Sequence, residues 1–477
     1  MDYQTYPPII CTDDFDQRSN IAWRVEQARD RQVLLEPRYP WDSASPCTGH
    51  GTVLRDPIDG RWKGWFVAVQ ENLHHARGKH DFRLVHVVSE DGREWTRPEL
   101  DLCPYEGYPR TNIVFDYESG GRTTYASVFV DPEAHPEEPY EMFCLRDARW
   151  QCPSGRVAGF GAAAGYGLYR YRSRDGIHWR PDHGPIDIRS DDTLQVHKDP
   201  DGSYVSHHKT SIPNYPGGWA PYDVDPRGCR ASFQCRSADG RVWTPSALNM
   251  VPDWLDSQGD QIIEVGRQPY GDGFIGLTAV YHSRLQEMDL QFAASASGEP
   301  LSWWRPARRP CLPLAPLGDY GGGMLWPTRT LVEDGDDLVL FYGALEGLHG
   351  DTYSVDETAY LFHGAFCRAS WRKGRMWAAV SAAGGGHEGV LTTRPRTDVR
   401  GRELVINAVA KPGGQVTCEL LRDGRPLEGY RREDCTPLTG DHTCAVIRWA
   451  GGTRCPAANV ALRLTMRGAY LYGYAWR

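Results

Sequence analysis

The stretch Ser89-Glu90-Asp91-Gly92-Arg93-Glu94-Trp95 returns as Ser173–Trp179 and again as Ser237–Trp243, each time with the pattern Ser-x-Asp-Gly-x-x-Trp. Two weaker copies lie at Ser297–Trp303 and Ser370–Trp377. Asp-Gly favours a tight turn because glycine adopts positive φ without steric cost, and the tryptophan begins the next packed strand. The repeat therefore predicts one pair of strands joined by a turn, used several times along the chain.

A second hairpin precedes the motif. Its first copy consists of Thr52–Asp56, a turn at Asp59-Gly60, and Trp62–Val69, and segments such as Gly167–Arg172 alternate between polar and apolar residues as half-buried strands do. Two hairpins that recur every roughly 60 to 85 residues predict a four-stranded blade. Five blades predict a β-propeller, because closing them into a ring removes the exposed sheet edges that an open row would leave.

The composition changes after the last copy of the motif, at the small-residue segment Ser381–Gly386. Beyond it, short alternating strands separated by turns such as Asp423-Gly424 predict a small, jelly-roll-like β-sandwich. We therefore expect an all-β protein with a five-bladed β-propeller over residues 1–380 and a β-sandwich over 381–477. Helical periodicity is nearly absent, and only Asn20–Arg31 is predicted as a short helix.

The charge balance excludes several classes of partner. The chain carries 53 basic and 62 acidic residues, a net charge of −9, which disfavours nucleic acid and anionic membrane surfaces. No apolar run reaches the roughly 18 to 20 residues needed to span a bilayer. The segment Met1–Tyr6 has neither a basic cap nor an apolar stretch, so no signal peptide is expected and we predict a cytoplasmic protein. The oligomeric state stays open.

The cysteines indicate buried thiols rather than a disulfide framework. There are 13, an odd number, and no Cys-x-x-Cys pair occurs. A structural zinc site needs close Cys or His pairs at ligand spacing, and the adjacent His207 and His208 cannot easily face one ion. We expect no metal and no cofactor.

Several segments outside the repeat resemble a group of bacterial glycoside-hydrolase-like proteins. The group is related in fold to glycoside hydrolase families 32, 43 and 68, the furanosidase-type five-bladed propellers. The resemblance implies the same propeller with a trailing β-sandwich, and a carbohydrate substrate. The segments that carry it are Pro40–Asp42, Gly51–Leu54, Thr111–Ile113, Tyr342–Gly350 and Asp434–Asp441, with the motif copy that ends at Pro98.

Hydrolysis of a glycosidic bond needs two carboxyl groups that face each other across the sugar, one protonated and one ionised. A propeller can supply them from the starts of the inner strands, which line its channel, so candidates are taken from those positions only. The candidates are Asp42 and His50 before the first blade, Asp191 and Asp192 before the third, Asp260, Glu264 and Arg267 at the fourth, and Asp319 before the fifth.

The resemblance to family 32 implies that Asp192 is the transition-state stabiliser and Glu264 the acid. The first blade departs from that family, because it has no Trp-x-Asn-Asp-Pro motif and His50 falls near the expected nucleophile. Asp42 lies upstream and can reach in from a loop. Glu264 stands in an apolar strand, where a carboxylate needs a partner such as Arg267 or has a raised pKa.

Other residues are candidates for binding the sugar. Trp326 can stack on the apolar face of a sugar ring, although packing between blades is the commoner role of tryptophan. His349 and the remaining polar candidates can bind hydroxyl groups, or can equally be turn formers and surface ion pairs. The predicted substrate-binding residues are His50, Asp191, Lys209, Asp260, Arg267, Trp326, Glu346 and His349.

Three functions remain open from the sequence. The first is a glycosidase acting on a furanoside, such as a fructoside or arabinofuranoside, with Glu264 as acid and Asp192, Asp42 or Asp319 as nucleophile or stabiliser. The unmatched first blade also allows elimination or transfer on the same scaffold. The others are a carbohydrate-binding propeller without catalysis and a propeller that binds a protein partner.

Overall fold

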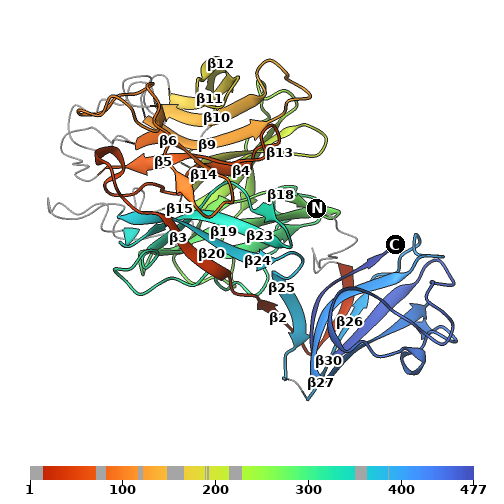
Figure 1. Ribbon diagram of the computed structural model, residues 1–477. Helices are drawn as coiled ribbons and strands as arrows, with labels where there is room; N and C mark the ends of the chain where they lie inside the picture. Colours follow the sequence, from red (N-terminus) through yellow and green to blue (C-terminus); the bar gives the residue numbers. More distant parts are fainter. Residues whose placement is uncertain are drawn as a thin grey trace.

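The computed structural model describes residues 14–70, 82–115, 122–147, 166–188, 190, 193–213, 228–349, 363–384 and 386–477. Within these ranges every regular element longer than one helical turn is a β-strand, which confirms the all-β prediction. Figure 1 shows a large body that contains most of the strands before residue 380 and a smaller body formed by the C-terminal strands. No described helix is long and apolar enough to cross a membrane.

Three antiparallel sheets follow one another along the chain, and in each the first four strands pair in sequence order; in the first sheet β8 also pairs with β6. Their first strands lie next to one another along a common axis, because β9 contacts both β4 and β13. The strands are β4 (Thr52–Arg55), β5 (Trp62–Val69), β6 (Phe82–Ser89), β7 (Trp95–Thr96) and β8 (Ile113–Phe115); β9 (Arg122–Val130), β10 (Tyr140–Asp147), β11 (Tyr166–Ser173) and β12 (Arg180–Ile186); and β13 (Leu194–Lys198), β14 (Tyr204–Pro213), β15 (Gly228–Ser237) and β16 (Ala247–Met250).

A nine-stranded sheet contains two further groups, which are joined by a single parallel bridge between Met288 and Met324. Strand β3 precedes the first sheet in the chain, yet it pairs with β24 at the far end of this sheet. The described strands thus form five antiparallel groups, and a strand from the N-terminal side completes the last one. The strands are β17 (Asp260–Val265), β18 (Gln268–Tyr270), β19 (Gly273–His282) and β20 (Glu287–Ser295), then β21 (Met324–Pro327), β22 (Val332–Asp334), β23 (Asp337–Leu345), β24 (Gly364–Arg372) and β3 (Arg29–Leu35).

The repeated motif forms the turn after the third strand of each of the first three sheets. In the first copy the Ser89 hydroxyl accepts a hydrogen bond from the Gly92 amide at 2.9 Å, and Asp91 accepts from the next two amides at 2.8 Å. The glycines have φ near 70°, as the turn requires. Asp91 and its counterparts are therefore turn formers, as the repeat predicts.

The same turn helps to join neighbouring sheets. Trp65, on β5, donates a hydrogen bond from its indole nitrogen to the Gly176 carbonyl at 2.6 Å. A Cβ atom at Gly176 would lie 2.8 Å from the Trp65 ring, so glycine is needed for the contact as well as for the backbone angle. Tryptophans and glycines from the repeat thus meet across a boundary between sheets.

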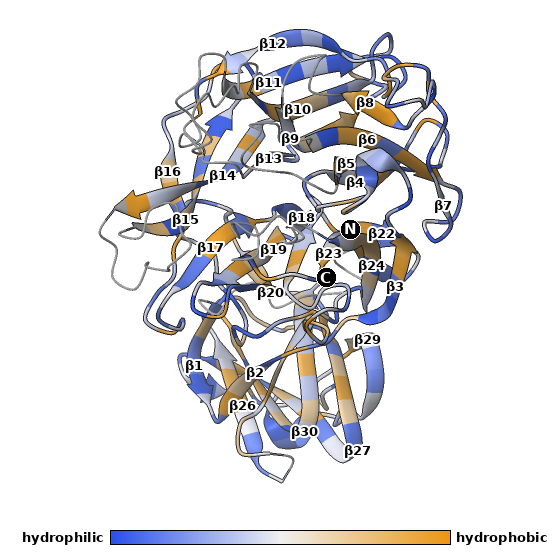
Figure 2. Ribbon diagram, turned by 90° about the vertical axis from the view of Figure 1, so that its left-hand side faces the viewer, coloured by the Kyte–Doolittle hydropathy of each residue, from blue (hydrophilic) through white to orange (hydrophobic). Residues whose placement is uncertain are grey.

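Eight strands form the C-terminal sheet, in which the long strands β27 and β30 pair along most of their length. Figure 2 shows these strands alternating between polar and apolar residues, and their apolar side chains pack into one core. The sheet also takes β1 and β2 from the N-terminal side of the chain, and β25, which spans the predicted division at 380/381. Its strands are β1 (Phe15–Ser19), β2 (Ile21–Val25), β25 (Trp377–Ser381), β26 (Glu388–Thr393), β27 (Leu404–Arg422), β28 (Arg425–Pro426), β29 (Gly440–Val446) and β30 (Ala461–Trp476).

The predicted helix at Asn20–Arg31 is wrong, because this segment forms β2 and the start of β3. Asn20 and Asp30 both have φ of 53°, a conformation that interrupts a helix. Strand β2 pairs with β25, and β3 with β24, so tertiary pairing overrides the weak helical pattern.

No disulfide joins two of the eleven described cysteines, and ten of them are buried. Burial raises the pKa of the Cys144 thiol to about 12, so this side chain stays protonated. The described residues also contain no group of three His, Cys, Asp or Glu side chains arranged to hold a metal ion.

Candidate functional site

Side chains from four different strand groups meet at the axis. The His50 ring, just before β4, stacks on Tyr125 of β9 with centroids 4.0 Å apart, and it meets the edge of Trp326 on β21 at 4.5 Å. The Tyr125 hydroxyl is 3.0 Å from the hydroxyl of Thr193, which precedes β13. We call His50, Tyr125, Thr193 and Trp326 the axial cluster.

The local sequence explains why His50 reaches this position. Gly49 has φ of 85°, and a Cβ atom there would lie 2.2 Å from the Trp326 carbonyl oxygen. A Cβ atom at Gly51 would lie 2.0 Å from the Trp65 carbonyl oxygen. The two glycines therefore let the backbone carry His50 between two sheets at a separation that no larger residue permits.

Tyr125 is held in a strained conformation. Its φ is 57°, which costs a non-glycine residue on the order of 1 kcal/mol, and the register of β9 against β10 shifts at this point. Such strain often accompanies functional positions. Sequence analysis missed Tyr125 because nothing in the segment around it signals the shift in register.

Glu264 lies on β17, the first strand of the fourth group. Its neighbour Ile263 packs in the same hydrophobic core as Tyr125 and Trp326, while Glu264 itself is 3 % exposed. A register shift between Ile262 and Glu264 turns the strand at this point. Glu264 lines a narrow crevice, with essentially no room for a water molecule, together with Gln195, His207, His208, Ser232 and the flanking residues of β17.

The histidines beside Glu264 are held neutral. Burial lowers the pKa of His207 to about 3 and that of His208 to about 4. His207 contacts the Val265 carbonyl oxygen at 2.7 Å, and His208 is 2.9 Å from the Ser246 hydroxyl. Uncharged imidazoles can orient a carboxyl group without fixing it in its ionised form.

Arg267, expected as the partner of Glu264, is engaged elsewhere. Its guanidinium donates two hydrogen bonds to Asp199, at 2.8 and 2.7 Å, and a third to the Gly298 carbonyl at 2.6 Å. Arg267 is 2 % exposed, and Asp199 follows the far end of β13. These contacts give Arg267 a structural role between two sheets.

Two of the predicted acids also have other roles. Asp42 accepts hydrogen bonds from the Arg38 and Tyr39 amides at 2.9 and 2.7 Å and pairs with the Arg97 guanidinium at 2.8 Å. Both of its oxygens are therefore occupied in a buried structural ion pair. Asp319 is an exposed turn residue whose amide bonds to the Pro316 carbonyl at 3.0 Å. Neither carboxylate joins the axial cluster.

Asp260 belongs to a buried ionic triad that the sequence did not reveal. The two nitrogens of His282 lie 2.7 Å from Asp260 and 3.0 Å from Asp289. Burial alone would lower the pKa of His282, but hydrogen bonds to the two carboxylates and their charges raise it to about 10. His282 is thus an imidazolium at neutral pH and fixes Asp260 in place.

The remaining predicted residues lie at the same end of the strands. His349 packs on Tyr281 with ring centroids 4.7 Å apart, and Arg230 covers the Tyr281 ring at 5.2 Å, which links three strand groups. Lys209, buried on β14, donates its amide to the Thr193 carbonyl at 3.0 Å. Glu346 is half-buried, 4.0 Å from His363. Asp191 and Asp192 lie outside the described residues.

Comparison with known proteins identifies similar folds only. No family model matches the sequence, and no curated protein matches it. One similar structure is a "Glycoside hydrolase", 11 % identical, covering 73 % of this chain and 92 % of its own, with a TM-score of 0.48. A thermostable family-43 glycoside hydrolase is 9 % identical, with coverages of 69 % and 89 % and a TM-score of 0.42. An N-acetylgalactosamine deacetylase from F. plautii is 15 % identical, with coverages of 74 % and 96 % and a TM-score of 0.46. At these values no similarity assigns a reaction or a substrate.

Proposed function

We propose that the protein is a glycosidase of a five-bladed propeller type that acts on a furanoside, with Glu264 as the general acid. One observation carries the proposal: Glu264 is buried on an inner strand, and its neighbour Ile263 shares a hydrophobic core with Tyr125 and Trp326 of the axial cluster. Aromatic rings suit the apolar face of a sugar, and a carboxyl group in an apolar strand suits proton donation.

The reaction follows from these roles. Glu264 gives its proton to the glycosidic oxygen as the bond to the anomeric carbon breaks. In an inverting reaction, water adds to that carbon and loses its proton to a second carboxylate. In a retaining reaction, that carboxylate attacks the carbon first; water then displaces it and loses its proton to the ionised Glu264. For that carboxylate we propose Asp192, on the sequence argument alone. Trp326 and Tyr125 would flank the sugar ring, and the buried Trp326 indole nitrogen, which has no hydrogen-bond partner among the described residues, would be the donor to a hydroxyl.

The test compares leaving groups in wild type and Glu264→Gln. With aryl arabinofuranosides and fructosides that need protonation, the variant should lose about 10²- to 10⁴-fold in kcat. The dinitrophenolate leaving group departs without being protonated, so the kcat for a dinitrophenyl glycoside should fall far less. Glu94→Gln, in an exposed turn, is the matched control and should retain full activity. Equal losses on both substrates, or no loss, would remove Glu264 from the acid role.

A carbohydrate-binding function without catalysis is the second candidate. It is favoured by the structural engagement of Asp42 and the exposure of Asp319, because neither of these predicted carboxylates of the first and fifth groups reaches the axial cluster. Wild-type protein that binds sugars but cleaves none of the glycosides would support this candidate. If Asp192→Asn abolishes turnover while sugar binding persists, the glycosidase is supported instead.

A further inference from the structure

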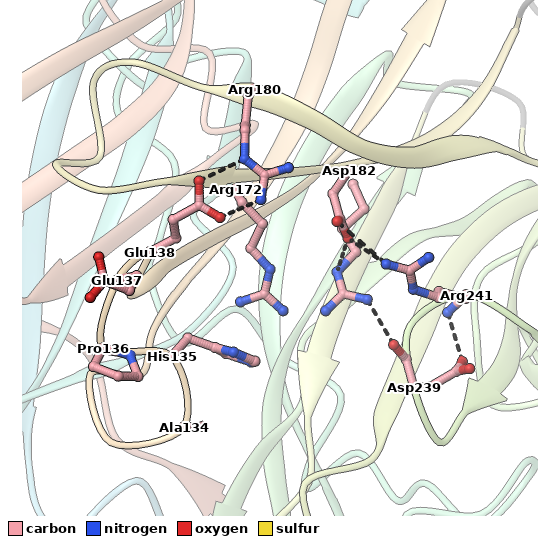
Figure 3. Close-up of a pocket in the computed structure, with 11 residues that line it drawn as sticks. Ala134, His135, Pro136, Glu137, Glu138, Arg172, Arg180, Asp182, Asp239 and Arg241 are labelled. Carbon is pink, nitrogen blue, oxygen red and sulfur yellow. Dashed lines mark hydrogen bonds and ion pairs between the residues drawn. The ribbon is translucent and has the colours of Figure 1, made fainter.

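A second pocket, of about 530 Å³, lies away from the axial cluster, between the second and third sheets. It is bordered by the connection from β9 to β10, by β11 and β12, and by the motif turn of the third sheet. These turns are at the opposite end of the strands from His50 and Thr193, because the inner strands begin at the cluster. We call this cavity the Arg172 pocket, and Figure 3 shows its lining.

Most of the charges around the Arg172 pocket are already matched. Arg180 binds Glu138, with its Nε atom 2.6 Å from the carboxylate. Arg241 lies 3.3 Å from Asp182. The Asp239 side chain accepts amides within its own turn, and its carbonyl accepts from Arg170 at 2.8 Å. These groups therefore form the walls of the pocket.

Arg172 is different. It is 6 % exposed, and its Nη2 atom lies 3.1 Å from Glu141, but its buried Nη1 atom has no hydrogen-bond partner among the described residues. Glu141 also pairs with Arg170 at 2.5 Å and accepts from the Tyr204 hydroxyl at 2.8 Å. One carboxylate thus serves two guanidinium groups. Arg170 also lies 3.4 Å from Asp182, whereas Arg172, at the pocket floor, pairs with Glu141 alone among the described carboxylates.

His135 stands beside that floor. Figure 3 shows its ring and the Arg172 guanidinium directed toward the same central space. Burial lowers the pKa of His135, and the charge of Arg172 lowers it further. A neutral imidazole can add a hydrogen bond to a ligand there without charge of its own. A buried donor left without a partner is costly, which favours a ligand or water at Nη1.

We propose that the Arg172 pocket binds the anionic group, a carboxylate, sulfate or phosphate, of a small molecule through the guanidinium of Arg172 and the imidazole of His135. Oxyanions form strong charge-assisted hydrogen bonds with guanidinium groups. The volume lies within the range of small-molecule sites, so the ligand can be larger than a bare ion. This site is separate from the proposed glycosidase site and does not depend on it.

The test is an NMR titration of the His135 imidazole in the full chain at constant ionic strength, with chloride as the balancing anion. Sodium sulfate and sodium glucuronate should each shift the His135 resonances saturably, and glucose should not. If glucuronate binds more tightly than sulfate, the ligand is an acidic organic molecule; if sulfate binds as tightly, the pocket recognises the anionic group alone. Arg172→Gln should weaken binding about tenfold or more.

Two further variants separate a lost site from a misfolded protein. Ala134→Glu places a carboxylate in the pocket from an exposed position and should abolish the shifts while leaving the unfolding midpoint unchanged. Glu137→Gln removes a negative charge from the rim and should strengthen binding about twofold. Absence of a saturable shift with both anions, or equal binding by wild type and Ala134→Glu, would overturn the proposal.

Discussion

Replacing His282 with glutamine tests the ionic triad that holds Asp260. The imidazole bridges Asp260 and Asp289, and the three side chains are 21 %, 9 % and 7 % exposed. Glutamine has a similar reach but no charge, and its donors sit on one nitrogen instead of the two separate ring nitrogens that contact Asp260 and Asp289. The change therefore leaves two buried negative charges close together with no cation between them.

The expected loss of stability in His282→Gln follows from the pKa of His282, which rises from 6.5 to about 10 on folding. Each pKa unit corresponds to about 1.4 kcal/mol, so the loss in unfolding free energy is at most about 5 kcal/mol. Partial exposure of His282 lowers the expected loss to about 2–4 kcal/mol. Because the folded pKa is raised, this stability is fully present below pH 6.5 and is lost as the pH rises through about 10. The variant should therefore differ most from wild type at pH 6.

Urea unfolding of wild type and His282→Gln at pH 6, 8 and 9.5 measures the difference. We expect the gap in unfolding free energy to narrow steadily as the pH rises. His178→Gln is the control, because the His178 side chain is 70 % exposed beside Asp175 and its loss should cost less than about 0.5 kcal/mol. A gap that stays constant from pH 6 to 9.5, or a His282 resonance that titrates near pH 6.5, would refute the reasoning.

Two other substitutions test structural roles. Asp42→Asn should lower the free energy of unfolding by about 3 kcal/mol, because it leaves Arg97 buried without its ion pair. Its kcat should stay unchanged. Urea unfolding and glycoside assays measure the two quantities, and lost turnover at full stability would contradict the structural role. Gly176→Ala should cost about 1–3 kcal/mol more than Gly60→Ala in thermal unfolding. Both glycines have φ of 75°, but only Gly176 has Trp65 against the added methyl group, so equal losses would exclude the packing effect.

The parts of the fold that sequence analysis predicted are those set by local physics. The turn that contains Asp91 is held by hydrogen bonds within a few residues, so the motif alone reveals it wherever it occurs. The pairing of β3 with β24 depends on residues hundreds of positions apart, and no local pattern signals it. The predicted helix at Asn20–Arg31 was wrong for this reason.

In the candidate site, too, local patterns were predicted from the sequence and long-range contacts were not. The position of His50 before an inner strand was predicted from the repeat, and the flanking glycines explain its placement. Asp42 satisfied the same rule of position, but Arg97 binds it from 55 residues away in sequence. Tyr125 escaped notice because its strained backbone arises from a shift in register rather than from a motif. Position in a repeat therefore predicts candidates, and long-range partners decide among them.

The placement of β1, β2 and β25 has a consequence for how the chain can be divided. Strand β1 pairs with β26, and β25 pairs with both β2 and β30, so the C-terminal body is assembled from both ends of the chain. A single proteolytic cut after residue 380 would strip it of three strands and leave unpaired edges that invite aggregation. During synthesis, β1 and β2 are made long before their partners β26 and β25. To obtain the propeller alone, the chain must be cut on both sides of it. The smaller body would stay intact only if the two outer pieces were then joined.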